Sequence, residues 1–262
     1  MLSFLNLSAQ KKTYPFKCGE KVSYKVYYNL AWVWVEAASV SFSVVDSIYQ
    51  NKKSIFFSSN GQSISSYDWI FKVRDHFSSF SNPKDLSPYK YIRDSKEGSH
   101  LVNNKYLFSK ETQQIFSYIK DSEKPSVNDT LSYKNSIFDI LSATYYLRTV
   151  DFRNKEIGDT ILVNTVMDNE LIKIKVIYIG EELIEHRNGK KYLCYKFKTK
   201  GVDGSIFDED SELIVWVSHD KNKIPIKIES EILVGSVKAF ISSVKNLKEA
   251  NTQVEKDFIM KD

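Results

Sequence analysis

The chain has 262 residues, a formal net charge of +4 and 14% aromatic residues, enough apolar surface for a substantial core. Its lysines are scattered through alternating segments such as KIKVIY and YKFKTK, a distribution unlike that of a nucleic-acid-binding protein. No apolar run approaches the roughly 18 to 20 residues that cross a bilayer, so no transmembrane segment is expected.

The N-terminal stretch MLSFLNLSA is a short apolar run that ends in two small residues, and Lys11 and Lys12 follow it. A secretory signal has such an apolar run and a small residue at its cleavage point. We therefore expect residues 1–9 to be the remnant of a signal peptide and residues 10–18 to be a lead-in segment. An ordinary frayed terminus is the alternative.

Apolar residues alternate with polar ones from Glu20 onward, which predicts half-buried strands. One predicted face of the first strand carries Val22, Tyr24, Val26 and Tyr28, and one phase of the next run carries Trp32, Trp34, Val40, Phe42 and Val44. Valine, isoleucine and aromatic residues predict further strands at 54–59, 67–73, 100–108, 114–120, 160–166 and 171–180.

Three turn signals organise the second half of the chain. Asn188-Gly189 between two strand patterns predicts a hairpin with a type I′ turn, which needs positive φ at both central residues. The polar stretch SHDKNK predicts a second hairpin, between strands near 213–217 and 224–228. The alternation changes phase at Gly235, which indicates a β-bulge or sharp bend that curves the sheet.

One segment has helical periodicity. Apolar residues recur at 137, 140, 141 and 147, which predicts an amphipathic helix of about four turns over residues 135–150, with Asn135 or Ser136 as N-cap. The preceding polar residues 122–132 and the stretch 81–88 are predicted loops. We expect a mainly β (α+β) fold: one domain over residues 19–247, a strongly curved antiparallel sheet or half-barrel of about ten or more strands wrapped around this helix, then a polar tail over 248–262.

The chain lacks the usual catalytic and cofactor motifs, and no cofactor or metal is expected. His76 and His219 each neighbour an aspartate, so a hydrolase is a weak alternative. The acidic run Asp208 to Asp210 fits a charged turn better than a calcium site. Cys18 and Cys194 are far apart, and we expect two unpaired thiols, with a disulfide as the alternative.

Large aromatic residues occur on both predicted faces of several strands, so either both faces are covered by core packing or one face lines an apolar cavity. Trp69 shares a phase with Phe71, and Trp216 shares one with Ile214. Plain core packing is the simpler reading. The candidate cavity lining is Trp34, Phe42, Trp69, Phe71, Ile140, Leu141, Leu147 and Trp216.

Four blocks, GEKVSYKVYYN, SYDWIFKVRDHFSSF, FDILSATYYLR and VWVSHDKNKIPIKIESEILVGSVKAFI, resemble in order and spacing the domain-of-unknown-function family 3108. The chain departs from the family pattern at His219, where an acidic residue is more usual, and at Trp32 to Trp34, where a glycine-containing turn is usual. The family consists of exported bacterial proteins, common in Bacteroidetes-type genomes, and has no established activity. The resemblance implies a periplasmic location and a wider kinship with the lipoprotein carrier and receptor proteins LolA and LolB, whose half-barrels hold acyl chains.

Together these observations predict a noncatalytic periplasmic binding module for a lipid, an acyl chain or another hydrophobic ligand. A structural or protein-interaction module of the cell envelope, with its interior filled by its own aromatic residues, is the alternative. A hydrolase is the third.

Overall fold

The computed structural model describes residues 13–30, 33–200, 212–231 and 236–260. The first half contains β1 (Lys21–Leu30), β2 (Val33–Tyr49), β3 (Lys52–Ser63), the 3₁₀ turn η1 (Ser65–Tyr67), β4 (Val73–Ser81), β5 (Pro88–Glu97), β6 (His100–Ser109), β7 (Gln114–Asp121) and β8 (Val127–Ser132). The second half contains α1 (Ile140–Leu147), β9 (Thr160–Met167), β10 (Glu170–Glu185), β11 (Lys191–Lys200), β12 (Glu212–Ser218), β13 (Pro225–Glu231), β14 (Ser236–Lys245) and α2 (Gln253–Phe258).

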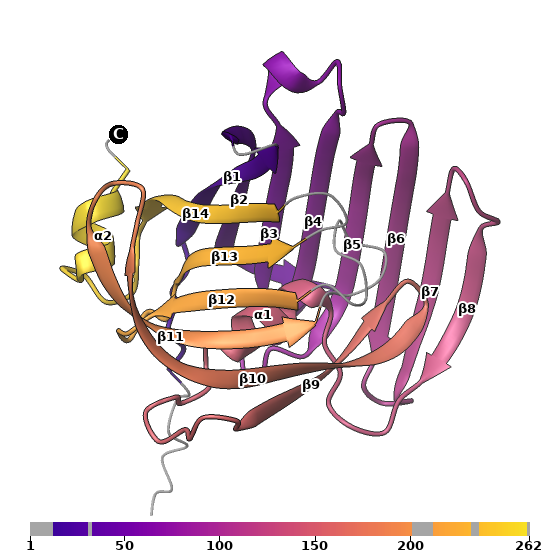
Figure 1. The fold of residues 1–262 in the computed structure, drawn as a ribbon. Coiled ribbons are helices and arrows are strands. Elements are labelled where there is room, and N and C mark those ends of the chain that lie inside the picture. Colours follow the sequence, from indigo (N-terminus) through magenta and orange to yellow (C-terminus); the bar gives the residue numbers. More distant parts are fainter. Residues whose placement is uncertain (1–12, 31–32, 201–211, 232–235, 261–262) are drawn as a thin grey trace, which may run out of the picture.

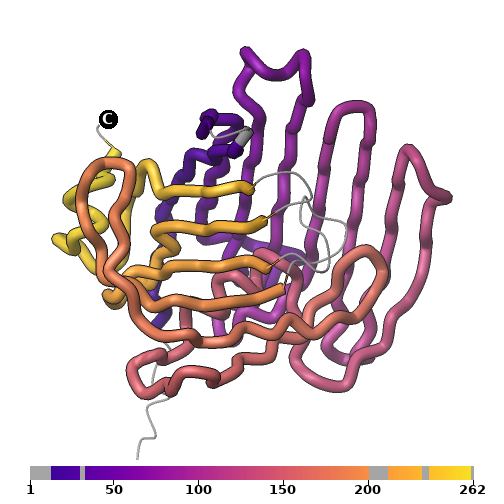
Figure 2. Tube along the Cα trace, viewed as in Figure 1, coloured from indigo at the N-terminus to yellow at the C-terminus, as the bar shows by residue number. Residues whose placement is uncertain are grey.

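All of these strands belong to one antiparallel sheet in the order β8-β7-β6-β5-β4-β3-β2-β1-β14-β13-β12-β11-β10-β9. The sheet curves so strongly that β9 to β14 cross in front of β2 to β6, with α1 between the two halves (Figure 1). The chain trace shows the same two crossing halves, the first in indigo to magenta and the second in orange to yellow (Figure 2). The prediction of one curved antiparallel sheet of ten or more strands is confirmed.

Most strands bury one face, as alternation predicts, whereas β11 buries residues on both faces. In β7, for example, Ile115, Ser117 and Ile119 are buried, whereas Phe116 and Tyr118 are exposed. We call the buried face, which looks toward α1, the inner face of the sheet. Residues that lie opposite each other on neighbouring strands point to the same side of the sheet. The pairing register therefore identifies the inner-face residues of each strand.

A β-bulge in β2 reverses the alternation within that strand. Val26 of β1 pairs with Ala38, but the next residue, Tyr27, pairs with Glu36, so Ala37 is an extra residue. The bulge puts Phe42 on the inner face and Trp34 on the outer face, although both fall in one phase of the sequence. The expectation that the two aromatic residues share a face is therefore wrong.

Two hairpin turns are each formed by a pair of polar residues with positive φ. Gln50 and Asn51 join β2 to β3, and Asp168 and Asn169 join β9 to β10; all four residues have positive φ, as type I′ turns require. The hairpin predicted at Asn188-Gly189 is confirmed, because β10 pairs with β11. Its turn is not type I′, since Gly189 has positive φ and Asn188 does not.

The predicted helix is shorter than expected. Helix α1 begins after Asp139, whose side chain accepts hydrogen bonds from the backbone N–H groups of Leu141 and Ser142 and forms a capping box. Residues before the cap are extended, and Phe138 forms a bridge with Thr165 of β9. The predicted N-caps Asn135 and Ser136 are therefore wrong. Ile137 and Phe138 are buried although they precede the helix, and their apolar side chains extended the apparent helical pattern toward the N-terminus.

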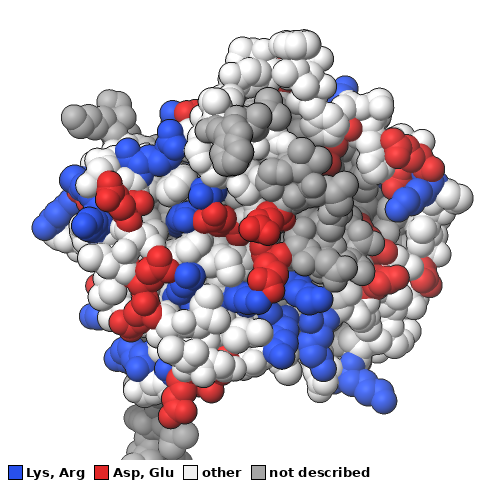
Figure 3. Space-filling model, in the orientation of Figure 1, with Lys and Arg blue, Asp and Glu red and all other residues white. Residues whose placement is uncertain are grey.

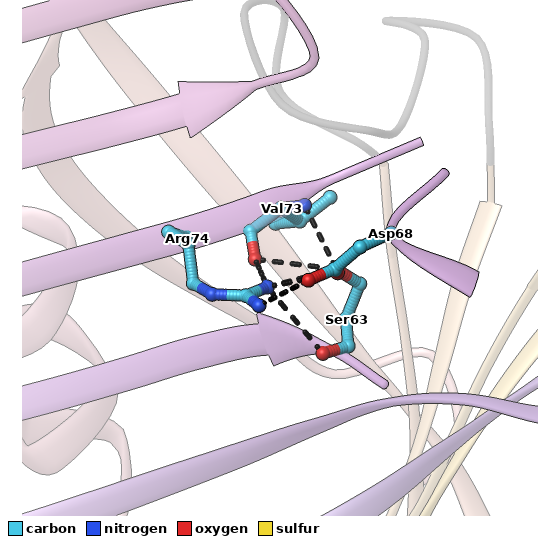
Figure 4. Close-up of polar contacts among 4 residues, drawn as sticks. All are labelled: Ser63, Asp68, Val73 and Arg74. Carbon is cyan, nitrogen blue, oxygen red and sulfur yellow. Dashed lines mark hydrogen bonds and ion pairs between the residues drawn. The ribbon is translucent and has the colours of Figure 1, made fainter. Parts of the chain in front are cut away.

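The stretch 67–73 was predicted as a strand but forms η1 and a turn before β4. Arg74 donates to the carboxylate of Asp68 at 2.5 Å, and the hydroxyl of Ser63 also contacts this carboxylate at 2.5 Å (Figure 4). These contacts tie the two ends of the turn together, so the apolar side chains between them point into solvent. Trp69 is 82% exposed.

Two further expectations are corrected. The segment 122–132, predicted as a loop, contains the edge strand β8. The segment after Leu247, predicted as a polar tail, contains a second helix, α2, which buries Val254 and Phe258 beside β14. Both segments were missed because β8 has only half-buried and exposed side chains and α2 buries only two, which is too few for a visible period.

Strands β13 and β14 are separate antiparallel partners with Glu231 opposite Ser236, and the bulge or bend expected at Gly235 falls between them. Gly235 itself lies outside the described residues. The hairpin predicted around SHDKNK is confirmed by the pairing of β12 with β13.

A buried ion pair joins the two halves of the sheet to the helix. Arg148, at the end of α1, donates to both carboxylate oxygens of Glu20 at 2.5 and 3.0 Å and to the carbonyl of Asn222 at 2.9 Å. Glu20 precedes β1 and Asn222 lies in the β12–β13 turn. The rings of Phe16 and Tyr145 each lie 5.4 Å from the guanidinium carbon. Three distant segments therefore meet at one charged side chain.

Replacing Arg148 by methionine leaves the Glu20 carboxylate buried without a partner. We expect Arg148→Met to lower the free energy of unfolding by about 3–5 kcal/mol, measured by urea denaturation at pH 7. The control Arg153→Met removes an exposed ion pair with Asp151 and should change the stability little. Equal stability of the two variants would contradict the role given to Arg148.

Candidate functional site

The inner face has two regions that differ in burial. Near α1 the side chains are fully buried: Phe57, Tyr106 and Leu141 belong to one continuous core cluster. Farther along the strands, toward the β3–β4 and β5–β6 turns, many inner side chains are only half-buried, although Ser95, Val102 and Asn104 are buried. We call this second region the distal inner face. These half-buried side chains are partly accessible to solvent.

One part of the distal inner face is apolar. Alternation from the buried Tyr24 places Val26 and Tyr28 on it, and the ladders extend it across four neighbouring strands. We define the apolar patch as Val26, Tyr28, Val40, Val215, Ile228, Val237 and Ala239, all half-buried. Aliphatic side chains on an inner face are usually buried in a sheet protein, so this patch is the feature that requires an explanation.

The adjoining part of the distal inner face is polar. We define the polar patch as Asp75, Arg93, Ser95, Glu97, Asn104 and Asp168. The hydroxyl of Ser95 donates to Asp75 and contacts Glu97 at 3.2 Å. Arg93 lies 3.8 Å from Glu97 and 3.6 Å from Asp168. Polar side chains thus form one connected network on β4, β5, β6 and the β9–β10 turn.

The two patches meet at Gly61. Val40 of β2, Gly61 of β3 and Asp75 of β4 occupy one cross-strand row. A Cβ atom at Gly61 would lie 3.6 Å from the Cβ of Asp75 and 3.8 Å from a methyl group of Val40. Since glycine adds no side chain between them, the apolar and polar patches form a continuous surface.

The β9–β10 turn completes the polar patch by docking on the first half of the sheet. Asn104 donates to Asp168 at 3.0 Å, and the backbone N–H of Asn169 donates to the Tyr106 hydroxyl at 3.3 Å. The side chain of Asn169 donates to Asp129 of β8 at 2.9 Å. Side-chain contacts therefore link the two ends of the curved sheet.

Burial shifts the titration of the carboxyl groups on the inner face. Burial raises the pKa of Asp75 above its ordinary value, although the Ser95 hydroxyl and the Arg93 charge act in the opposite direction. Burial also raises the pKa of Asp139, the α1 cap, which is fully buried and accepts a 2.6 Å hydrogen bond from Ser79. Asp139 has its partners within the core, whereas Asp75 lies in the half-buried patch.

The structure brings four of the eight predicted cavity residues, Phe42, Ile140, Leu141 and Leu147, into one core cluster and places the other four elsewhere. Leu141 is buried beneath the sheet, and Ile140 and Leu147 pack at the edge of the same cluster. Phe42 is half-buried on the inner face beside Tyr24. Phe71 is exposed in the turn that also exposes Trp69.

Trp34 and Trp216 lie on the outer face. Trp216 pairs with Lys196 and Lys227 across the ladders, its indole N–H donates to Glu182 at 3.0 Å, and the Lys227 ammonium is 4.1 Å from its ring. Lys238 lies 4.4 Å from the ring of Trp34. Trp216 is buried because long charged side chains cover it. The alternating acidic and basic groups are visible across β11 to β14 in the front view (Figure 3).

The histidines and cysteines give no catalytic arrangement in the described part of the chain. His76 contacts the side chain of Asn60, and His219 contacts Glu181 and stacks on Tyr195; neither contacts a serine hydroxyl. The two thiols are unpaired, as predicted. The acidic run 208–210 lies outside the described residues. Among the described residues, no group of three or more His, Cys, Asp or Glu is placed to hold a metal ion.

A separate cavity of about 320 Å³ lies on the outer face, between the β10–β11 turn, β14 and α2. Its lining includes Tyr27, Phe240 and Arg187, whose guanidinium lies 4.1 Å from the Tyr27 ring. His186 closes one side, and its imidazole is bonded to the Ile241 carbonyl and the Asn188 N–H. Burial lowers the pKa of His186. Tyr27 and Phe240 alternate along their strands with Val26 and Ala239 of the apolar patch, so this cavity lies on the opposite side of the sheet from that patch.

Sequence reasoning missed the polar patch, although a signal was present. Tyr91, Arg93, Ser95 and Glu97 share one phase of β5, and Tyr91 is buried. Charged residues that continue a buried phase indicate a polar region on an inner face. The contacts of Asp168 could not be inferred, because they depend on how far the sheet curves.

A protein-family model described as "Protein of unknown function (DUF3108)" matches residues 23–242. Among solved structures, the chain is similar to the crystal structure of a beta-barrel-like protein of domain of unknown function DUF1849 from Brucella abortus. The TM-score is 0.53 at 7% sequence identity, covering 87% of this chain and 97% of that one. At this identity the likeness concerns the fold alone. No curated protein matches the sequence.

The raised pKa of Asp75 predicts a pH effect. A carboxyl group that binds its proton more tightly in the folded state stabilises the fold below the unfolded pKa of about 4, and loses this contribution as the pH rises through the folded pKa. In Asp75→Asn the side chain is neutral at every pH, so the variant does not lose this stability as the pH rises. We expect its stability relative to the wild type to increase from pH 4 to pH 7, measured by urea denaturation.

Asp94→Asn, on the exposed outer face of the same sheet, is the matched control. A stability difference between Asp75→Asn and the wild type that is constant with pH would contradict the prediction.

Proposed function

The chain belongs to the DUF3108 family of proteins of unknown function, and we propose that it is a noncatalytic module that binds a lipid, an acyl chain or another hydrophobic ligand on its inner face. The observation that supports this proposal is the apolar patch, seven half-buried side chains on the concave side of a well-formed sheet. Pairing of the strands leaves their backbone groups satisfied, so contact with an apolar chain needs no polar motif.

The energetics of such binding are favourable. Each methylene group removed from water contributes roughly 0.8 kcal/mol, and an acyl chain of about ten carbons offers several such groups even after the cost of ordering it is subtracted. A ligand lying along Val26, Val40 and Ile228 would also cover these side chains, which water otherwise reaches. The apolar patch therefore suits a flexible hydrocarbon better than a small polar metabolite.

We also propose that the protein is exported and works in the periplasm. The apolar run at residues 1–9 supports this proposal, and this run lies outside the described residues. Neither described helix has the length and hydropathy of a membrane-spanning helix. The kinship to LolA and LolB stays a hypothesis at the level of fold, and it agrees with a role in handling acyl chains.

The alternative function is a protein-interaction module of the cell envelope. Strand β8 favours it: this six-residue strand is at one end of the sheet order, so one of its edges has no strand partner among the described residues. An extended segment of another protein could add to this edge. Asp129 and the short length of β8 oppose such pairing. The apolar patch favours the ligand-binding proposal instead.

The test is binding of a neutral fluorescent probe, N-phenyl-1-naphthylamine, together with native mass spectrometry of the protein purified from cells. We expect saturable binding by the wild type and at least about tenfold weaker binding by Ile228→Glu, because a carboxylate in the apolar patch must be desolvated when the probe binds. The control Ile48→Glu changes an exposed residue at the far end of β2 and should bind like the wild type.

Absence of saturable binding and of any copurified lipid would overturn the proposal and favour the interaction module. Equal affinities of Ile228→Glu and Ile48→Glu would place the probe elsewhere on the protein.

A further inference from the structure

We propose that the ligand of the inner face carries a head group that donates hydrogen bonds, either hydroxyl groups or an ammonium group, and that the polar patch accepts them. This inference rests on the proposed function, since it names the class of ligand that the apolar patch would hold. Its physical basis is that the polar patch has more carboxyl groups than cations, and that two buried amide oxygens there accept no hydrogen bond from the described residues.

The charges of the patch disfavour an anionic head group. Three carboxyl groups, those of Asp75, Glu97 and Asp168, accompany one guanidinium, that of Arg93. Even when Asp75 is protonated, the patch holds two carboxylates and one cation, so its net charge is negative. A fatty-acid carboxylate or a phosphate placed there would meet net negative charge in a partly buried setting, where like charges repel more strongly than in water.

Arg93 is already engaged. Its guanidinium lies between the carboxylates of Glu97 and Asp168, at 3.8 and 3.6 Å, and its central carbon is 5.8 Å from the Phe77 ring. An anionic ligand would have to draw Arg93 away from these partners and leave both carboxylates uncompensated. The arginine therefore organises the carboxylates of the patch and does not offer a free anion site.

Two buried amide oxygens strengthen the argument independently of charge. Among the residues that the structure describes, the Oδ1 atoms of Asn104 and Asn169 have no hydrogen-bond partner, and Asn104 is only 2% exposed. The orientation of each amide is determined by a carboxylate, because the Nδ2 of Asn104 donates to Asp168 and that of Asn169 donates to Asp129. Reversing either amide would place two acceptors face to face.

Buried polar atoms are nearly always hydrogen-bonded, and leaving one unpaired is costly. The missing partners of Asn104 and Asn169 must be donors, since an amide oxygen can only accept. Both asparagines lie where the β9–β10 turn docks on β6, next to Asp168. A ligand hydroxyl or ammonium in the patch would supply donors at the place where they are lacking.

The head group can reach the patch from solvent. The side chain of Asp168 is 39% exposed and that of Glu97 is 25% exposed, and the buried Asn104 donates a hydrogen bond to Asp168. The apolar patch begins on the other side of Gly61, so a chain lying on Val40 would place its polar end beside Asp75. One amphipathic molecule thus fits both patches.

The experiment compares three ten-carbon ligands as competitors of N-phenyl-1-naphthylamine, below their micelle concentrations: decyl glucoside, decylammonium and decanoate. We expect the glucoside and the ammonium compound to displace the probe at concentrations at least about tenfold lower than decanoate, because hydrogen bonds to carboxylates are charge-assisted. Asn104→Leu should reduce the preference for the glucoside, and Asp168→Asn should reduce that for decylammonium. Asp94→Asn should change neither.

Decanoate binding as tightly as the other two ligands would overturn the inference and leave the proposed function standing, with the unfilled amide oxygens then assigned to bound water. If the probe itself fails to bind, the proposed function fails as well. Preferences that are unchanged in both Asn104→Leu and Asp168→Asn would show that the head group lies outside the polar patch, which also overturns the inference.

Discussion

The buried ion pair between Arg148 and Glu20 is the constraint on which the rest of the structure depends. Removing two charges from water is costly and is offset only when geometry and hydrogen bonding are complete. The guanidinium meets this condition by bonding both oxygens of Glu20 and the carbonyl of Asn222. Since these groups come from the start of β1, the end of α1 and the β12–β13 turn, the pair holds the helix and both halves of the sheet in one arrangement.

This anchoring at one end explains the division of the inner face. Helix α1 lies deep between the two halves and fills that region with buried side chains, including Leu141 and Tyr145. It has only eight residues and does not extend toward the β3–β4 turn, so the distal inner face stays half-buried. At that end the sheet is held by Asp168 and Asn169 in the β9–β10 turn. A short helix and a docked turn together create the accessible surface to which we assign function.

Much of the sheet could be predicted from sequence, because a strand with one buried face shows its alternation directly; β6, β7, β9 and β10 were placed within a few residues. The candidate site could not. Trp34 and Phe42 share a phase in sequence, yet the bulge at Ala37 places them on opposite faces. Trp216 has the size and burial of a core residue, but lysine side chains cover it on the outer face.

The sequence by itself determined that the chain is mainly strand, that it has a helix near residue 140 and that its two cysteines have no metal-ligand spacing. These properties depend on local periodicity and on residue type. Only the tertiary structure decided which residues share a surface. Curvature brings Asp168 to Arg93, and burial by neighbouring strands leaves the Oδ1 atom of Asn104 without a hydrogen-bond partner among the described residues. Both effects depend on contacts between residues far apart in the chain, and no local pattern encodes them.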